Sequence, residues 1–220
     1  FEAPTVAQLE RLLSESTAVA QIDTEQGRLQ GEFALLPIQQ WFFDKSLATP
    51  NHWNQAFMVH IPGETSLAEI EQALLALAEQ HDMLRCGFVA EQAGYQQCYE
   101  EDGAQWMAPL QSLDVAAMNE EALHGQLTQW QNGFNLEQGP LWQAGHLTGY
   151  ADGSARLFFA FHHLIIDAVS WRIITEDMRL LLTGQTLPAK GSSYRQWVSA
   201  VAGYAKSHTD EEAYWQGVVE

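Results

Sequence analysis

The sequence predicts an α+β lobe, an α/β sandwich in which helices flank a mixed, largely antiparallel sheet. Two pairs of strand-like runs predict the sheet, 83–91 with 95–100 and 141–149 with 155–163, each pair joined through a glycine-containing turn. Helical stripes of apolar residues are interspersed with these runs, without the strict strand–helix alternation of a parallel sheet. A hydrophobic content of 46%, with 10 Phe and 8 Trp, provides the material for a packed core.

Each further element has a local signal. Pro37 begins a helix that runs to Phe43, because proline fits the first helical turn. Alternating side chains in 54–61 predict a strand, and Ser66 with Glu69 forms a capping box before a helix. Other helices are predicted in segments 4–13, 119–132, 169–182, 193–206 and 210–219.

The charge of the chain excludes two broad classes of function. Asp and Glu number 28 and Lys and Arg 10, so the formal net charge is −18. This surplus repels phosphate backbones and anionic lipid surfaces, so we expect neither nucleic acid nor membrane as a partner. No apolar run is long enough to span a bilayer. Cys86 and Cys98 lack metal-binding spacing, and we expect them to be reduced thiols in a cytoplasmic protein.

One segment combines the character of a buried strand with titratable side chains. The apolar run 157–161 leads into His162 and His163, and Asp167 follows just before a predicted helix. Successive side chains on a strand point to opposite faces, so the two imidazoles are not expected to serve one site. We expect one to face a cleft and the other to be tied into the structure. Burial keeps an imidazole neutral, as a general base requires.

Asp167 has two candidate partners. It could orient an imidazole, or it could pair with Arg85, an isolated charge within an apolar strand-like run. From the residues alone, a catalytic, a structural and a metal-binding role of the segment all stay open. Divergence of neighbouring strand residues argues against metal, and no phosphate loop, nucleophile elbow or HExxH motif is present.

Three runs of letters resemble a known family. The run HHLIIDA at 162–168 resembles the HHxxxDG motif of the condensation superfamily of nonribosomal peptide synthetases, whose members share the fold of chloramphenicol acetyltransferase. Ala168 stands where that motif has Gly. The runs LPIQQWFF at 36–43 and VSWRI at 169–173 resemble the epimerization subfamily in particular. The resemblance covers about residues 31–220 and implies the N-terminal lobe of a chloramphenicol acetyltransferase-like fold.

The start of the chain resembles a second domain of these synthetases. Residues 1–14 are similar to the last helix of a peptidyl carrier protein, and the polar stretch 15–30 is similar to an interdomain linker. We therefore expect 31–220 to be the N-terminal lobe of an epimerization or condensation-type domain, without its second lobe. The chain begins with Phe1 rather than Met, as expected of a piece of a longer protein.

The resemblance implies an isomerase that acts in nonribosomal peptide synthesis, as in antibiotic biosynthesis. The Cα of an aminoacyl or peptidyl thioester, held on the phosphopantetheine of an adjacent carrier domain, would be inverted from L to D. By motif position, His163 is the acid/base group and His162 has a mainly structural role. Asp167 is expected to pair with Arg85. Supporting structural roles fall to Ser170 and Trp171.

The resemblance also implies which groups and partners are involved. No directly bound cofactor or metal is expected, and the phosphopantetheine belongs to the partner carrier. The other partner is the missing C-terminal lobe, where the second acid/base group is expected, so this piece alone should be inactive. Three alternatives stay open: a condensation domain that joins two carrier-bound substrates, an inert docking lobe, and a free acyltransferase of the chloramphenicol type.

Overall fold

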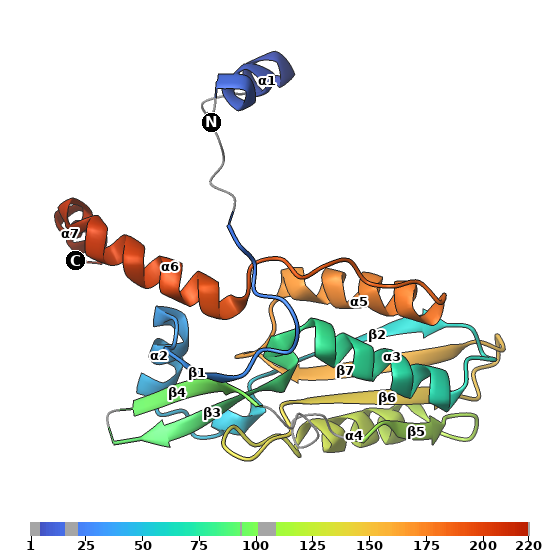
Figure 1. Cartoon of the computed structure of the whole chain (residues 1–220). Coiled ribbons are helices and arrows are strands. Elements are labelled where there is room, and N and C mark those ends of the chain that lie inside the picture. Colours follow the sequence, from blue (N-terminus) through green and yellow to red (C-terminus); the bar gives the residue numbers. More distant parts are fainter. Residues whose placement is uncertain (1–4, 16–21, 93, 101–108, 220) are drawn as a thin grey trace.

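The computed structural model describes residues 5–15, 22–92, 94–100 and 109–219 (Figure 1). The strands are β1 (Gly31–Phe33), β2 (Asn54–Ile61), β3 (Cys86–Glu91), β4 (Gly94–Tyr99), β5 (Gln111–Asp114), β6 (Trp142–Thr148) and β7 (Ala155–His162). The helices are α1 (Val6–Glu15), α2 (Pro37–Asp44), α3 (Leu67–Gln80), α4 (Glu120–Gln131), α5 (Ala168–Leu182), α6 (Tyr194–Ser207) and α7 (Glu212–Val219). Short 3-10 turns are η1 (Pro50–His52), η2 (Asp82–Arg85) and η4 (Thr209–Glu211).

The strands form two sheets. One has three strands in the order β1-β4-β3, and the other has four in the order β2-β7-β6-β5. Neighbouring strands pair antiparallel, except that β5 and β6 are parallel. The mixed, largely antiparallel arrangement predicted from the sequence is therefore confirmed, although it is divided between two sheets.

Most element predictions agree with the structure, and the exceptions have physical reasons. The short strands β1 and β5 were not expected, because three or four residues are too few to show a period of two. The predicted strand 83–91 begins only at Cys86, since Met83 lies in the 3-10 turn η2. Arg85 therefore lies in a turn and not within a strand, which corrects the sequence-based expectation.

The four-stranded sheet is covered on both faces. The larger core cluster joins α3 and α5 to one face, where Phe159 and Phe161 of β7 pack. The smaller cluster joins α4 to the other face, where Phe158 and Ala160 of β7 pack. Alternate residues of β7 thus enter different cores, as the predicted strand requires.

The packing of α4 depends on a glycine in the sheet. A Cβ atom at Gly145 of β6 would lie 2.2 Å from the ring of Trp130, well inside van der Waals contact. Trp130 in turn packs against Phe158 at a ring distance of 5.9 Å. Gly145 therefore provides the space into which the helix inserts its indole ring.

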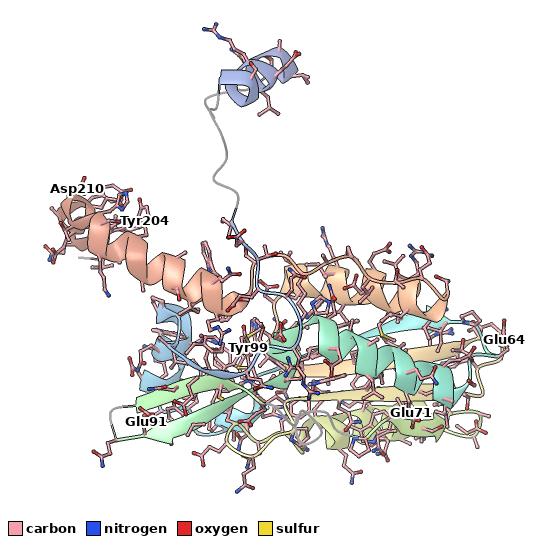
Figure 2. The ribbon with its side chains drawn as sticks, in the orientation of Figure 1. Glu64, Glu71, Glu91, Tyr99, Tyr204 and Asp210 are labelled. Carbon is pink, nitrogen blue, oxygen red and sulfur yellow. The ribbon has the colours of Figure 1, made fainter. Side chains whose placement is uncertain are left out.

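Charged side chains lie mainly on the outside of the molecule. Glu64, Glu71, Glu91 and Asp210 are exposed, and Glu64, Glu91 and Asp210 lie at the edge of the molecule in Figure 2, whereas Tyr99 lies inside. None of the helices that the structure describes is both long and apolar enough to cross a membrane.

Candidate active site

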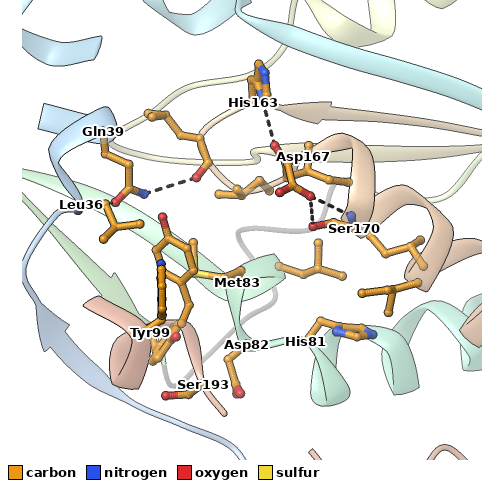
Figure 3. Close-up of a pocket in the computed structure, with 18 of the residues that line it drawn as sticks. Leu36, Gln39, His81, Asp82, Met83, Tyr99, His163, Asp167, Ser170 and Ser193 are labelled. Carbon is orange, nitrogen blue, oxygen red and sulfur yellow. Dashed lines mark hydrogen bonds between the residues drawn. The ribbon is translucent and has the colours of Figure 1, made fainter. Parts of the chain in front are cut away.

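A pocket of about 770 Å³ opens beside the end of β7, between α2, α5 and α6 (Figure 3). This volume is in the range of sites that hold small molecules. His163, Asp167, Ser170 and Gln39 contribute polar side chains to its wall. The apolar part of the wall includes Leu36, Ile38, Trp41, Ile173 and Trp197.

His163 follows the last residue of β7 and lines the pocket with an exposed ring. Its Nδ1 lies 2.8 Å from the carbonyl oxygen of Ile166, and its backbone N–H donates to the carbonyl of Trp53 at 2.7 Å. Because a carbonyl oxygen only accepts, the proton of the neutral ring is on Nδ1 and the lone pair is on Nε2. The ring is therefore fixed in the tautomer whose Nε2 can take up a proton.

His162 has the opposite environment. Its side chain is fully buried, its Nε2 lies 2.8 Å from the carbonyl oxygen of Pro50, and the backbone N–H of Leu164 donates to its Nδ1 at 3.2 Å. Phe42 packs edge-on against the ring. Burial lowers the pKa of His162 to about 4, so the ring is neutral near pH 7. Of the two histidines, His163 lines the pocket and His162 does not, which agrees with the prediction that they do not share one site.

Asp167 has a local partner, and its predicted pairing with Arg85 is wrong. Its Oδ1 accepts from the backbone N–H of Ser170 at 2.8 Å and from the Ser170 hydroxyl at 2.6 Å (Figure 3). These contacts make Asp167 the N-cap of α5. The hydrogen bond from the Ser170 hydroxyl holds the pKa of Asp167 below its usual value, so the carboxylate stays charged at neutral pH.

Arg85 is buried in a different cluster, where it pairs with Asp82 three residues before it. Its guanidinium also donates to the carbonyl oxygens of Glu100 at 2.7 Å and of Leu29 at 3.3 Å. Lys190 contacts the second oxygen of Asp82 at 2.8 Å. A three-residue spacing within one turn brings Asp82 to Arg85, so Asp167 is not needed to balance the buried charge. The partner of Arg85 is therefore Asp82 and not the predicted Asp167.

Ser170 and Trp171 continue the first turn of α5. The Ser170 hydroxyl donates to the Asp167 carboxylate and so supports the turn between His163 and α5. Trp171 packs on Phe57 of β2 at a ring distance of 5.4 Å, and it does not line the pocket. Both residues therefore join α5 to its surroundings.

Two glutamines contact the site and were not predicted as site residues. Gln55 of β2 places its Nε2 at 2.9 Å from the His163 Nε2, although the two are 108 residues apart. Gln39 of α2 is buried and donates to the carbonyl oxygen of Leu164 at 3.4 Å. In the sequence, Gln55 stands out as a polar residue near the start of an apolar strand, and Gln39 as a polar residue in an apolar helix. Neither signal says which distant residue is its partner.

The donor set does not suit a metal ion. Within the described residues, no group of three or more His, Cys, Asp or Glu side chains is arranged to hold one. The arrangement at His163, with Nδ1 bound to a carbonyl oxygen and the Nε2 lone pair facing the amide of Gln55, suits transfer of a proton.

Comparison with known proteins identifies the family. The family model of the condensation domain matches residues 29–220. The chain belongs to the condensation-domain family of nonribosomal peptide synthetases.

Curated condensation-family relatives are synthetases of much greater length. N-(5-amino-5-carboxypentanoyl)-L-cysteinyl-D-valine synthase of Penicillium rubens is 40% identical over 207 residues, which are 94% of this chain and 5% of that protein. The enzyme of the same name from Amycolatopsis lactamdurans is 42% identical over 193 residues, 88% of this chain and 5% of that protein. A linear gramicidin synthase of Brevibacillus parabrevis is 33% identical, covering 98% of this chain and 4% of that protein.

Solved condensation-family structures confirm the chloramphenicol acetyltransferase-like fold class. The epimerization domain from the third module of tyrocidine synthetase B superposes with a TM-score of 0.80 and 32% identity, over 90% of this chain and 46% of that chain. The starter condensation domain of rhizomide synthetase gives a TM-score of 0.69 and 24% identity, over 84% of this chain and 47% of that chain. This chain thus spans about half the length of each solved domain.

Proposed function

We propose that this condensation-family chain is one lobe of an epimerization domain. Its reaction inverts the Cα of an aminoacyl or peptidyl thioester from L to D, while the substrate is held on the phosphopantetheine of an adjacent carrier domain. The observation that carries the proposal is His163, whose Nδ1 is fixed by Ile166 so that Nε2 can exchange a proton beside the pocket. The segments LPIQQWFF and VSWRI, which resemble epimerization domains, form α2 and the first turns of α5 at this pocket.

Two comparisons support epimerization over amide formation. The tyrocidine epimerization domain has a higher TM-score and identity to this chain than the rhizomide starter condensation domain has. The names of two relatives at 40% and 42% identity include a D-valine residue, whose Cα has the configuration that such a reaction yields.

The proposed chemistry is a proton transfer at Cα. The Cα–H bond breaks, an N–H bond forms at Nε2 of His163, and the electron pair moves into the thioester carbonyl to give an enolate. Return of a proton to the opposite face of Cα gives the D-epimer and favours a second acid/base group there. A positioned group of this kind contributes about 10²–10⁴-fold to the rate. His162, buried and bonded to Pro50, supports the strand end and does not touch the substrate in this scheme.

The second acid/base group is assigned to a C-terminal lobe that would close the pocket. Large apolar side chains at the pocket rim are 47–65% exposed, and such exposure is typical of a surface that meets a partner. They are Ile38, Trp41, Ile173 and Trp197. In the same proposal 1–14 is the last helix of the carrier domain, 15–30 is the linker, and 31–220 is the N-terminal lobe. Cys86 and Cys98 are free thiols, consistent with a cytoplasmic location.

Condensation is the second candidate, because the matching family model describes a condensation domain. The experiment uses the intact synthetase module that contains this chain, loaded with one carrier-bound, Cα-deuterated aminoacyl thioester. Epimerization predicts loss of deuterium to water and formation of the D-epimer with no second carrier substrate present. Retention of deuterium, together with amide formation once a second loaded carrier is added, would assign the domain to condensation instead.

A further inference from the structure

The nitrogen of His163 that is proposed to exchange a proton has a partner on the neighbouring strand. Gln55 lies near the start of β2, opposite Phe161 of β7 in the antiparallel register. Its side-chain Nε2 lies 2.9 Å from the His163 Nε2. Since the His163 Nδ1 carries the proton of the neutral ring, Nε2 accepts from the amide N–H of Gln55.

The other end of the same amide has no partner. The Oε1 of Gln55 is buried, and no hydrogen bond to it is found among the described residues. A buried polar atom without a partner costs stability, so its presence at a site calls for a functional reason. Rotation of the terminal amide exchanges the positions of oxygen and nitrogen, and this torsion is broad. After rotation, the oxygen would face the His163 Nε2.

This rotation matches what an acid/base group needs. A neutral imidazole has a lone pair on Nε2 and binds a donor, whereas an imidazolium has N–H there and binds an acceptor. An amide supplies both in one side chain. We propose that Gln55 is a positioning residue that holds the Nε2 of His163 in both protonation states by turning its side-chain amide. The inference rests on the proposed acid/base role of His163.

Gln55 must also release His163 when a substrate arrives. The lone pair of the imidazole Nε2 has one in-plane direction, and the amide N–H of Gln55 occupies it in this structure. A substrate Cα–H that is to lose its proton must take that place. Once the proton is on Nε2, the Gln55 oxygen can accept from it until the proton is passed on.

His162 on β7 and Asp167 at the start of α5 are the titratable groups next to His163 in the described residues, and His52 on η1 lies behind His162. His162 on β7 is neutral, because burial lowers its pKa to about 4. His52 on η1 faces His162 and contacts Asn54. Asp167 at the start of α5 stays charged, because the Ser170 hydrogen bond lowers its pKa. Because every Gln55 variant keeps these groups and Gln55 itself contacts His163, a change in the pH profile on substitution of Gln55 reports that contact.

The test measures deuterium washout from Cα against pH in the intact module. Gln55→Met keeps the length of the side chain and removes both hydrogen-bonding atoms. We expect kcat/KM to fall about tenfold, because both protonation states of His163 lose a partner. For the same reason, the acid limb of the pH profile should stay within about 0.3 pH unit of its position in the unaltered module. Gln55→Glu accepts but does not donate, so it favours the imidazolium and moves the acid limb up by about one pH unit.

A matched control separates this contact from a general effect of charge. Gln129 is exposed on α4, away from the pocket lining, and Gln129→Glu adds the same charge there. Its profile should equal that of the unaltered module. An equal shift in the Gln129→Glu and Gln55→Glu variants would overturn the proposal. So would a Gln55→Met shift of more than about half a pH unit in either direction, since that means only one protonation state is held.

Failure of the proposed function and failure of this inference give different results. If the unaltered module shows no washout, the function is wrong, and an NMR titration of the His163 ring, assigned with His163→Gln, tests Gln55 without any activity. The ring should titrate about one pH unit higher in Gln55→Glu than in the unaltered protein. If Gln55→Met does not fold, the Gln55→Glu variant alone tests the proposal. An unchanged midpoint of the His163 titration and an unchanged acid limb of the washout profile in that variant would overturn it.

Discussion

His162 and His163 are neighbours in sequence, and each ring binds a backbone carbonyl oxygen, but one ring is buried and the other is exposed. His162 is buried, packs against Phe42 and binds the carbonyl oxygen of Pro50, so its neutral ring has a structural role. His163 is exposed one residue past the strand, where Ile166 fixes its tautomer and the side-chain amide of Gln55 contacts its Nε2. The difference shows that the chemical role of an imidazole depends on its burial and its partners more than on its neighbours in sequence.

Asp82 and Asp167 differ in a similar way. Asp82 is buried and bonds Arg85, Lys190 and the backbone N–H of Leu29. Asp167 is exposed and caps α5 through hydrogen bonds that a neutral side chain can also accept. The first therefore neutralises buried charge, whereas the second organises a turn.

The largest expected effect is on the rate at His163. In the intact module, His163→Ala should reduce Cα-deuterium washout by about 10²–10⁴-fold, because the positioned proton acceptor is lost. The free energy of unfolding should change by less than about 1 kcal/mol, since the ring is exposed and water can bond the Ile166 carbonyl. Normal washout in this variant would remove His163 from the acid/base role.

The next largest effect is on the free energy of unfolding, when Asp82 and Asp167 are each replaced by Asn. Asp82→Asn leaves the buried guanidinium of Arg85 without its counter-charge and should lower the free energy of unfolding by about 3–5 kcal/mol. Asp167→Asn should change it by less than about 0.5 kcal/mol, because Asn caps helices about as well as Asp. Urea denaturation of both variants checks the contrast, and similar losses would show that Asp167 also balances a buried charge.

The smallest effect is the pH dependence of the free energy of unfolding that the buried His162 causes. The unfolded His162 takes up a proton near its ordinary pKa of 6.5, but the folded one does so only near its lowered pKa of about 4. Its contribution to stability is therefore complete above about pH 6.5 and is lost as the pH falls towards 4, by about 3 kcal/mol in total.

The control for this pH dependence is a variant without the ring. His162→Asn should be less stable than the unaltered chain at pH 7 and should lose stability less steeply between pH 6.5 and 4. Burial also lowers the pKa of His146, so a residual slope remains in both proteins. Equal slopes in urea titrations across this range would contradict the buried, neutral assignment of His162.

Much of the structure was predictable because its signals are local. The strand β2 has the predicted bounds, and the Ser66–Glu69 capping box starts α3 as expected. These features depend on residues within a few positions of one another, through side-chain period and end-capping. The HHLIIDA run likewise indicated the family and the neighbourhood of the pocket.

By itself, the sequence determined the type of lobe, most of its elements and the two histidines as the centre of interest. Only the tertiary structure decided the partners: Asp82 for Arg85, Ser170 for Asp167, and Gln55 for His163. Two of these partners lie only three residues away, yet the sequence also allows Arg85 and Asp167 to pair with each other, and the choice depends on the fold. Gln55 reaches His163 through the register of β2 on β7, and that register is set by the packing of whole sheet faces and not by any short motif.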